Sequence, residues 1–244
     1  MDLGLEGRVA AASRGLGRGA ARALAAEGVR VAICGRDRAR VEETASEIGE
    51  RAVPLVCDVS TERGARAFVE LAEAAVGPLD ILVANAGGPP PGTFASTELA
   101  AYRDAIELNL LSTIAMCRAA VPGMRARGFG RVLAITSIGA REPIPYLIAS
   151  VTARAGVTGF LKVLASEVAP DGVTVNSIQP GIHATDRVTQ VTRDVDALAR
   201  TLPVGVLGDA DDFGRCVAFL CSTSARFVTG TSLLVDGGAS RALS

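Results

Sequence analysis

A glycine-rich segment near the start of the chain is the first sign of chemistry. It reads Ser13-Arg14-Gly15-Leu16-Gly17 and lies between a short apolar stretch and a helix-length stretch. Glycines at the start of a helix let backbone N–H groups approach a pyrophosphate, and the helix dipole favours the anion. The segment therefore predicts a dinucleotide phosphate site. A plain tight turn between strand and helix is the alternative.

The end of the second apolar stretch indicates which dinucleotide is bound. An acidic residue there would bind a ribose 2′-hydroxyl and favour NAD. This chain instead has Gly35 followed by Arg36, while Arg14 lies in the phosphate segment. Two guanidinium groups are suited to a 2′-phosphate, which they hold through charged hydrogen bonds. Asp37 is the competing acidic residue, but it is better placed as a helix N-cap. We therefore predict NADP(H), with a solvated surface arginine as the alternative for Arg36.

Short β-rich stretches alternate with helix-length stretches along the whole chain. The predicted strands are mostly apolar, as expected for strands covered on both faces, and span residues 8–12, 29–34, 52–57, 79–84, 130–136, 173–178 and 232–235. Predicted helices include residues 16–27 and 38–49, and Ser60-Thr61 and Asp209 are N-cap positions of two more. This alternation predicts one doubly wound α/β domain over residues 1–244, with ligands bound beyond the carboxyl ends of the strands.

The composition is that of a soluble globular protein and excludes several classes. Of the 244 residues, 49% are hydrophobic and 21% are charged, and the formal net charge is −1. The charges do not cluster by sign, so we expect no nucleic-acid partner. No uncharged apolar run reaches the ~18 residues of a membrane span, so we expect no membrane partner. Five cysteines without metal-ligand spacing predict reduced thiols, no bound metal and a cytoplasmic protein.

Further segments lie where the predicted strands end or on the helices between them. They are Cys57-Asp58-Val59, Ala84-Asn85-Ala86-Gly87, Glu107-Leu108-Asn109, Ile135-Thr136-Ser137, Pro180-Gly181-Ile182-His183-Ala184-Thr185 and Val235-Asp236-Gly237-Gly238. With the glycine segment, their order and spacing resemble the short-chain dehydrogenase/reductase family over essentially the whole chain. The resemblance implies a Rossmann-type domain with a mostly seven-stranded parallel sheet. It also implies hydride transfer between a nicotinamide and a carbonyl or alcohol.

The resemblance implies a role for each segment. The glycine segment binds the pyrophosphate, although Ala11 stands where the family has its first glycine. Asn109 and Ser137 match two members of the catalytic tetrad, and Ser137 polarises the carbonyl. The implied cofactor-binding residues are Asp58 and Val59 at the adenine, Asn85, Ala86 and Gly87 after the fourth strand, and Pro180, Gly181, Ile182 and Thr185 over the nicotinamide.

The family's defining Y-x-x-x-K pair is missing from this chain. The tyrosine is expected thirteen residues after Ser137, but the chain has Ser150 there and Arg154 in place of the lysine. The only lysine is Lys162, and neither tyrosine is followed by a lysine four positions later. The pattern resembles a divergent, 3-oxoacyl-carrier-protein reductase-like branch that carries Ser and Arg. We assign Ser150 and Arg154 to the catalytic site, and we expect Arg154 also to reach the nicotinamide ribose.

Replacing tyrosine by serine removes the usual proton donor. A tyrosine hydroxyl has a pKa near ~10, whereas a serine hydroxyl is a far weaker acid, with a pKa close to that of water. The difference is worth ~8 kcal/mol of driving force. If half of it enters the barrier, the rate falls on the order of a thousandfold.

Three sources of the proton remain open. Ser150 can relay a proton from a ribose hydroxyl, a water and Asn109. Tyr146 can swing in from the loop before the helix, unless it is a rim residue. His183 has an imidazole with an ordinary pKa near ~6.5, unless it faces solvent from its loop.

Two functions and an assembly follow as expectations. The first function is an NADP(H)-dependent oxidoreductase for a ketone or 3-oxoacyl substrate, or its alcohol, covered by residues 186–207. The second is a weakly catalytic or non-catalytic NADP(H)-binding sensor or subunit. Small and apolar residues at 109–124 and 147–168, with the edge at 232–243, predict a homotetramer, or failing that a dimer.

Overall fold

Seven parallel strands form one sheet, as the sequence predicts. The computed structural model describes residues 2–13, 15–185, 188 and 194–243, and its strand order is β3-β2-β1-β4-β5-β6-β7. The strands are β1 (Val9–Ser13), β2 (Arg30–Gly35), β3 (Ala52–Val56), β4 (Ile81–Ala84), β5 (Gly130–Ile135), β6 (Val173–Pro180) and β7 (Ser232–Val235). The order changes direction between β1 and β4. This is the doubly wound Rossmann-type arrangement, in which ligands bind at that switch point.

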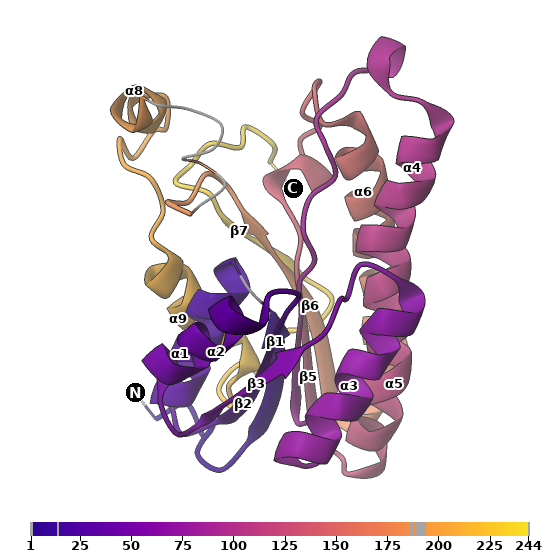
Figure 1. Ribbon diagram of the computed structural model, residues 1–244, viewed down its shortest axis with the longest axis vertical. Helices are drawn as coiled ribbons and strands as arrows, with labels where there is room; N and C mark the ends of the chain where they lie inside the picture. Colours follow the sequence, from indigo (N-terminus) through magenta and orange to yellow (C-terminus); the bar gives the residue numbers. More distant parts are fainter. Residues whose placement is uncertain (1, 14, 186–187, 189–193, 244) are drawn as a thin grey trace.

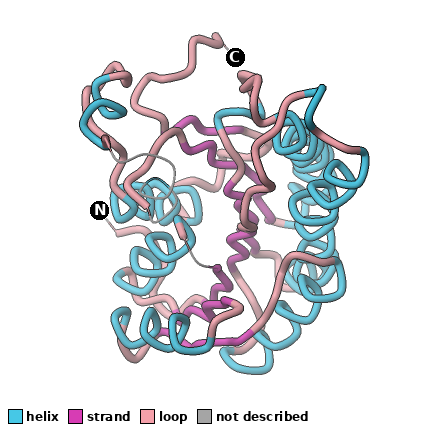
Figure 2. The backbone as a smooth tube through the Cα atoms, turned by 45° about the horizontal axis from the view of Figure 1, so that its top comes forward, coloured by secondary structure: helices cyan, strands magenta, loops and turns pink. Residues whose placement is uncertain are grey.

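Helices cover both faces of the sheet, which lies between the two layers in Figure 2. One layer contains α1 (Leu16–Ala26), α2 (Arg38–Ile48) and α9 (Ala210–Cys221), and the other contains α3 (Glu62–Val76), α5 (Ser112–Ala126) and α6 (Ile148–Val168). The shorter elements are the 3-10 turns η1 (Phe94–Ser96), η3 (Ile138–Ala140) and η4 (Ala169–Asp171), the π-helix η2 (Ile106–Leu111), and the helices α4 (Leu99–Ala105) and α8 (Val195–Arg200). In Figure 1, α4 and α8 stand on opposite sides above the carboxyl edge of the sheet.

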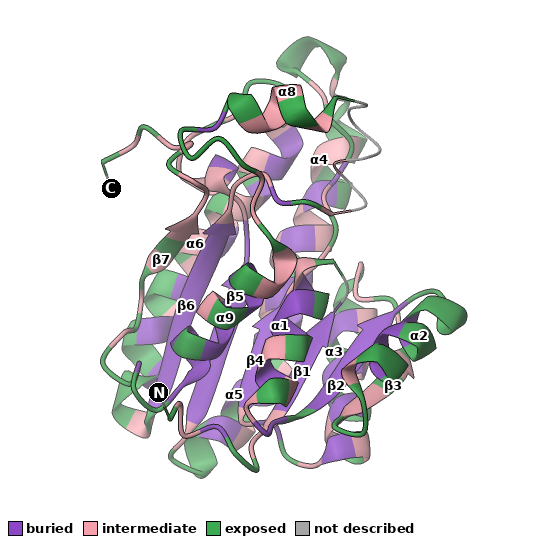
Figure 3. Ribbon diagram, turned by 90° about the vertical axis from the view of Figure 1, so that its left-hand side faces the viewer, coloured by how far each residue is buried: buried purple, intermediate pink, exposed green. Residues whose placement is uncertain are grey.

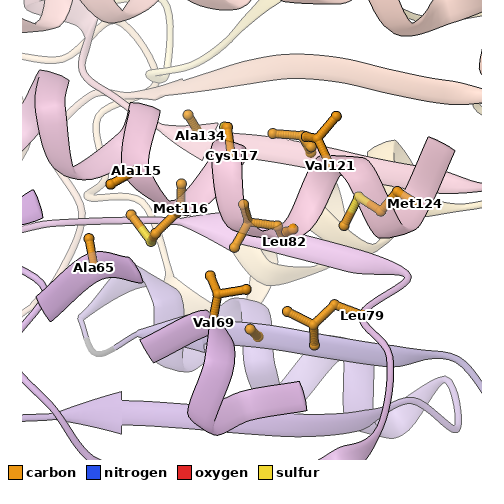
Figure 4. Packing of buried hydrophobic residues seen from close by; sticks show 14 of the residues in the cluster. Ala65, Val69, Leu79, Leu82, Ala115, Met116, Cys117, Val121, Met124 and Ala134 are labelled. Atoms are coloured by element: carbon orange, nitrogen blue, oxygen red, sulfur yellow. The ribbon is translucent and has the colours of Figure 1, made fainter. Parts of the chain in front are cut away.

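The apolar strands place alternate side chains in two cores. In β4, Leu82 packs toward α3 and α5 in the cluster of Figure 4, whereas Val83 packs toward α1 and α9. Phe68 and Phe213 are the largest buried side chains of the two sides. Each such residue contributes roughly 1.5–3 kcal/mol on burial. Figure 3 shows the inner strands buried along most of their length, whereas the edge strands β3 and β7 are partly exposed, so both faces of the sheet are covered at its centre.

The three predicted N-caps are confirmed. The Asp37 carboxylate accepts a hydrogen bond from the Arg40 backbone N–H at 3.2 Å, and Thr61 Oγ1 accepts one from Gly64 at 3.1 Å. The Asp209 carboxylate accepts from the N–H groups of Asp211 and Asp212, the second and third residues of α9. These caps satisfy N–H groups that lack partners within their helices, and so they define where α2, α3 and α9 begin.

Two glycines let α1 and α9 meet backbone to backbone. A Cβ atom on Gly19 would lie 1.9 Å from the Ala210 carbonyl oxygen, and one on Gly214 would lie 2.1 Å from the Gly19 carbonyl oxygen. Any larger residue would therefore force the helices apart. This contact holds α1, and hence its N-terminus, in place beside β1.

Two helical stretches are long and apolar enough to cross a membrane by length and composition alone. They are Leu99–Ala126 and Ile148–Asp171, with 50% and 33% of the apolar window buried inside the protein. Both pack on the sheet through α5 and α6. Core helices of soluble proteins pass the same test, so this finding is weak evidence for a membrane span.

Candidate active site

The N-terminus of α1 lies at the carboxyl end of β1 and forms the predicted phosphate site. Gly15 is its N-cap with a φ of 76°, a conformation that L side chains rarely adopt. No side chain caps this end among the described residues. Leu16 and Gly17 follow in the first turn, so their N–H groups face an open helix end suited to a pyrophosphate. The predicted contribution of Arg14 lies outside the described residues.

Two hydrogen bonds join the loops on either side of the switch point. Ser13 Oγ donates to the Asn85 carbonyl oxygen at 2.8 Å, and Asn85 Nδ2 donates to Ser13 Oγ at 3.1 Å. Beyond Asn85, the carbonyl of Gly87 accepts a hydrogen bond from Asn109 Nδ2 at 2.8 Å. The segment with Asn85, Ala86 and Gly87 is therefore held between the loop before α1 and Asn109.

The adenosine end of the site carries Arg36 and Asp58 on neighbouring strands. Arg36 is exposed just after β2, and no carboxylate pairs with it among the described residues, whereas the arginines of α2 pair with nearby carboxylates. Asp58 is exposed after β3, where one carboxylate oxygen accepts from the Ser60 N–H at 3.0 Å. Val59 packs partly into the core and orients this turn. The arrangement presents a guanidinium without a carboxylate partner among the described residues, one strand away from the carboxylate predicted to bind the adenine.

Arg154 connects α6 to the end of β5. Its Nε donates to Ser150 Oγ at 3.3 Å, and its Nη1 donates to the carbonyl oxygens of Thr136 at 2.6 Å and Ile135 at 3.3 Å. Ser137 follows directly, and its Oγ accepts from the Gly139 N–H at 3.0 Å. The structure therefore brings Ser137, Ser150 and Arg154 to one end of the sheet, as predicted.

These contacts define what the serine hydroxyls can do. Because Ser150 Oγ accepts a hydrogen bond from a guanidinium, its own proton must point elsewhere. The positive charge also favours the deprotonated form of the serine. Ser137 Oγ likewise accepts from a backbone N–H, which leaves its proton to donate. Both hydroxyls are thus arranged as donors, and Arg154 keeps its charge throughout.

Asn109 lies in the π-helix η2, an element often found at functional sites. Its main-chain carbonyl oxygen accepts from Thr113 Oγ1 at 2.7 Å. Its side-chain Oδ1 is buried and has no hydrogen-bond partner among the described residues. Buried polar atoms are usually paired, so this oxygen is a candidate acceptor for a water or a ligand hydroxyl.

The two other proposed proton sources occupy different surroundings. His183 is buried, with its ring edge-to-face on Phe213 at 5.1 Å between centroids. Burial lowers the pKa of His183, so the imidazole is neutral at pH 7. The solvent-facing interpretation of His183 is therefore wrong, and its contacts with α9 disfavour the role of proton donor. Tyr146 is exposed, and its carbonyl accepts from the Gly92 N–H at 2.8 Å at the rim.

The segment predicted to cover the nicotinamide follows β6. The Gly181 N–H donates to the Val235 carbonyl at 3.0 Å, and the Ile182 carbonyl accepts from Gly208 at 3.0 Å. Pro180 ends β6, and Thr185 is partly buried at the far end of the segment. Backbone contacts with β7 and the 208 region therefore hold this segment above the edge of the sheet.

Sequence reasoning missed two buried polar side chains at the carboxyl ends of β5 and β6. Thr136 Oγ1 and Gln179 Oε1 are both buried and have no hydrogen-bond partner among the described residues. The Thr136 N–H donates to the carbonyl oxygen of Ile178, the residue before Gln179, so Thr136 and Gln179 lie on adjacent chain segments. The Thr136 carbonyl, which accepts from Arg154, is a backbone group and leaves no trace in the sequence. Gln179 was detectable as a polar residue at the end of an apolar strand.

Comparisons with known proteins show the family of the chain. A family described as enoyl-(acyl carrier protein) reductase matches residues 10–240. The chain is 33% identical to the 3-oxoacyl-(acyl-carrier-protein) reductase of Haemophilus influenzae, over 96% of this chain and 98% of the relative. The chain belongs to the short-chain dehydrogenase/reductase family. This family consists of nucleotide-binding oxidoreductases, and substrates differ among its members.

Two solved structures share both the fold and the family. L-sorbose reductase from Gluconobacter frateurii, complexed with NADPH and L-sorbose, matches all of both chains with a TM-score of 0.92 and 30% identity. An NADPH-bound short-chain oxidoreductase from Pseudomonas aeruginosa PAO1 is described as containing an atypical catalytic center. It matches 96% of this chain and 97% of its own, with a TM-score of 0.90 and 32% identity.

Proposed function

We propose that this protein is an NADP(H)-dependent reductase of a ketone or 3-oxoacyl substrate, or a dehydrogenase of the corresponding alcohol, with Ser150 and Arg154 in place of tyrosine and lysine. The observation that carries the proposal is the Arg154–Ser150 hydrogen bond beside Ser137 at the carboxyl edge of the sheet. A protein that only bound the dinucleotide would not need Ser137 and Ser150 as paired donors. Consumption of NADPH with ketones, diketones and 3-oxoacyl thioesters tests the proposal.

The residues of this chain act around the reacting carbonyl in the following way. Bound NADPH supplies the hydride. Ser137 donates a hydrogen bond to the oxygen as negative charge develops on it. Ser150 gives its proton to that oxygen, and Arg154 stabilises the serine oxygen that remains. A proton taken up from solvent, passed on by a water at Asn109 Oδ1, which has no partner among the described residues, then restores the Ser150 hydroxyl.

The residues at the predicted cofactor site fit NADP(H). The open end of α1 suits the pyrophosphate, Asp58 suits the adenine amino group, and Arg36 lacks a carboxylate partner among the described residues. Arg154, together with Pro180, Gly181, Ile182 and Thr185, would hold the nicotinamide end. The NADPH complexes of the two similar reductases support this choice over NAD(H).

Replacing Arg36 by aspartate tests the choice of cofactor. We expect Arg36→Asp to lose most of its NADPH affinity and to gain some NADH affinity, because the change removes a 2′-phosphate partner and repels that anion. Fluorescence titration with both cofactors measures the effect, and Arg38→Asp, at the first residue of α2, is the matched control. Equal NADPH affinity in the Arg36 variant and the wild type would show that Arg36 does not bind the 2′-phosphate.

The fold also supports proposals for domain organisation, assembly and location. The whole chain acts as one cofactor-binding and catalytic domain, in which residues 186–207 cover the substrate. Residues 186–187 and 189–193 of that segment lie outside the described residues. The fold and the relatives favour a cytoplasmic enzyme that acts on small molecules rather than on nucleic acid or at a membrane.

Exposed apolar residues on two sides of the molecule predict a homotetramer. Leu111 and Val163 are exposed on the outer side of η2 and α6, and Phe227 and Leu233 are exposed at the β7 edge. Pairing each side across a two-fold axis would bury it and give four subunits. Light scattering at micromolar concentration measures the mass, and a dimer would mean that only one of the two sides associates. A monomer would contradict the prediction.

A weakly catalytic or non-catalytic NADP(H)-binding sensor or subunit is the second candidate. The missing Tyr-Lys pair favours it, because Ser150 alone is a poor acid. It predicts tight NADPH binding without turnover of any carbonyl compound.

A further inference from the structure

Residues 236–243, which follow β7, form a strap at the carboxyl edge of the sheet (Figure 1). Asp236 fixes its path, because Oδ1 accepts from the Gly238 N–H at 3.0 Å and Oδ2 accepts from the Ser240 N–H at 2.8 Å. Gly237 and Gly238 both have positive φ angles, 63° and 80°, which allow the tight turn. The strap is therefore an ordered element up to Ser240, rather than a loose end.

The start of the strap contacts the segment that covers the nicotinamide. A Cβ atom on Gly181 would lie 2.8 Å from the Cα of Asp236. The two backbones thus approach as closely as a glycine permits, and the strap begins against the proposed cofactor site.

The turn of the strap contacts the end of the proposed substrate cover, residues 186–207. The Val204 N–H donates to the Gly237 carbonyl at 3.3 Å, and a Cβ atom on Gly237 would lie 2.6 Å from Val204 Cγ2. Pro203 lies against Gly238 in the same way, 3.4 Å from the position of a Cβ atom. Residues 203–204 therefore rest directly on the strap.

The far end of the strap is held by Glu142. Its Oε2 accepts from the Arg241 N–H at 2.6 Å and from Ser240 Oγ at 2.8 Å. These two hydrogen bonds lower the pKa of Glu142 below its usual value, so the carboxylate is charged at neutral pH. Glu142 stands in the loop between β5 and α6, after Ser137 and before Tyr146.

We propose that Glu142 is a positioning residue for the substrate. Its carboxylate binds the strap, and the strap in turn contacts Val204. Glu142 thereby sets the distance between its own loop, from Ser137 to Tyr146, and the end of the proposed substrate cover. The expected effect on KM rests on the proposed function, whereas the contact through the strap does not. The hydrogen bonds of Arg154 to Ser150 and of Ser13 to Asn85 do not involve the strap. Loss of the Glu142 contact therefore loosens the substrate's surroundings and leaves the Arg154–Ser150 and Ser13–Asn85 contacts in place.

Kinetics of four variants test the role of Glu142. Glu142→Ala should raise the KM for the carbonyl substrate about tenfold, with kcat and the KM for NADPH within about twofold of the wild type. Glu142→Gln keeps an acceptor oxygen and should recover most of the loss. Truncation after Ala239 should match Glu142→Ala, and combining the two should add nothing. Glu50→Ala, in the turn before β3, is the control.

Hydrogen exchange of the cofactor-free protein separates this proposal from the proposed function. Glu142→Ala should increase exchange in both residues 138–147 and residues 202–206, whereas Glu50→Ala should change neither. Faster exchange in the 138–147 loop alone would overturn the proposal, because the strap would not transmit the contact. A loss of kcat with an unchanged KM would also overturn it. Faster exchange in both segments, in a protein without any reductase activity, would support the contact through the strap and contradict the proposed function.

Discussion

Restoring the missing pair, with Ser150→Tyr and Arg154→Lys together, is expected to raise ketone reduction by one to three powers of ten. The tyrosine would bring back an acid with a pKa near ~10 in place of serine, which recovers much of the lost driving force. The lysine would release the carbonyls of Ile135 and Thr136, which Arg154 holds in this structure. The steady-state rate of NADPH consumption with a small ketone measures the change.

The two single variants are the controls for this prediction. Ser150→Tyr alone leaves Arg154 tied to β5, and Arg154→Lys alone leaves no strong acid, so we expect each to fall below the double variant. Ser150 is buried, and a tyrosine ring needs space there, so folding is checked by thermal unfolding and by NADPH binding. A folded, NADPH-binding double variant without any gain in rate would show that position 150 does not face the reacting carbonyl.

Ser137→Ala is expected to lower the rate of carbonyl reduction roughly a hundredfold, because it removes a donor to the developing oxyanion. Ser137 Oγ already accepts from Gly139, so its proton is the part that the substrate would use. NADPH affinity should stay unchanged, which separates catalysis from cofactor binding. Ser166→Ala, on the exposed C-terminal part of α6, is the matched control. A Ser137→Ala variant with the wild-type rate would place the polarising donor elsewhere.

The fold was predictable because its signals are local. Apolar strands, helix-length spacers and caps such as Asp37 and Asp209 each depend on a few neighbouring residues. The predicted ends of the strands were less accurate, because pairing with another strand determines where a strand ends. Strand β6 runs on to Pro180 because Val235 of β7 pairs with it, and no local pattern shows that pairing.

The site was predictable as a set of positions but not as a set of contacts. The family resemblance placed Ser137, Ser150 and Arg154 together, and the structure does bring them to one edge. The Arg154 side chain is oriented by hydrogen bonds to two backbone carbonyls. Every residue has a backbone carbonyl, so the sequence does not show these contacts. His183 likewise packs on Phe213, thirty residues later in the chain, and a loop position gives no sign of that contact.

The most direct test of the central claim is NADPH consumption by the purified wild-type protein across ketones, diketones and 3-oxoacyl thioesters, measured beside NADPH binding. Enzymatic reduction predicts steady turnover of at least one class of carbonyl compound, with a stoichiometric alcohol product and a large loss of rate in Ser137→Ala. Tight NADPH binding with no turnover across the whole panel would contradict it and leave the sensor or subunit function.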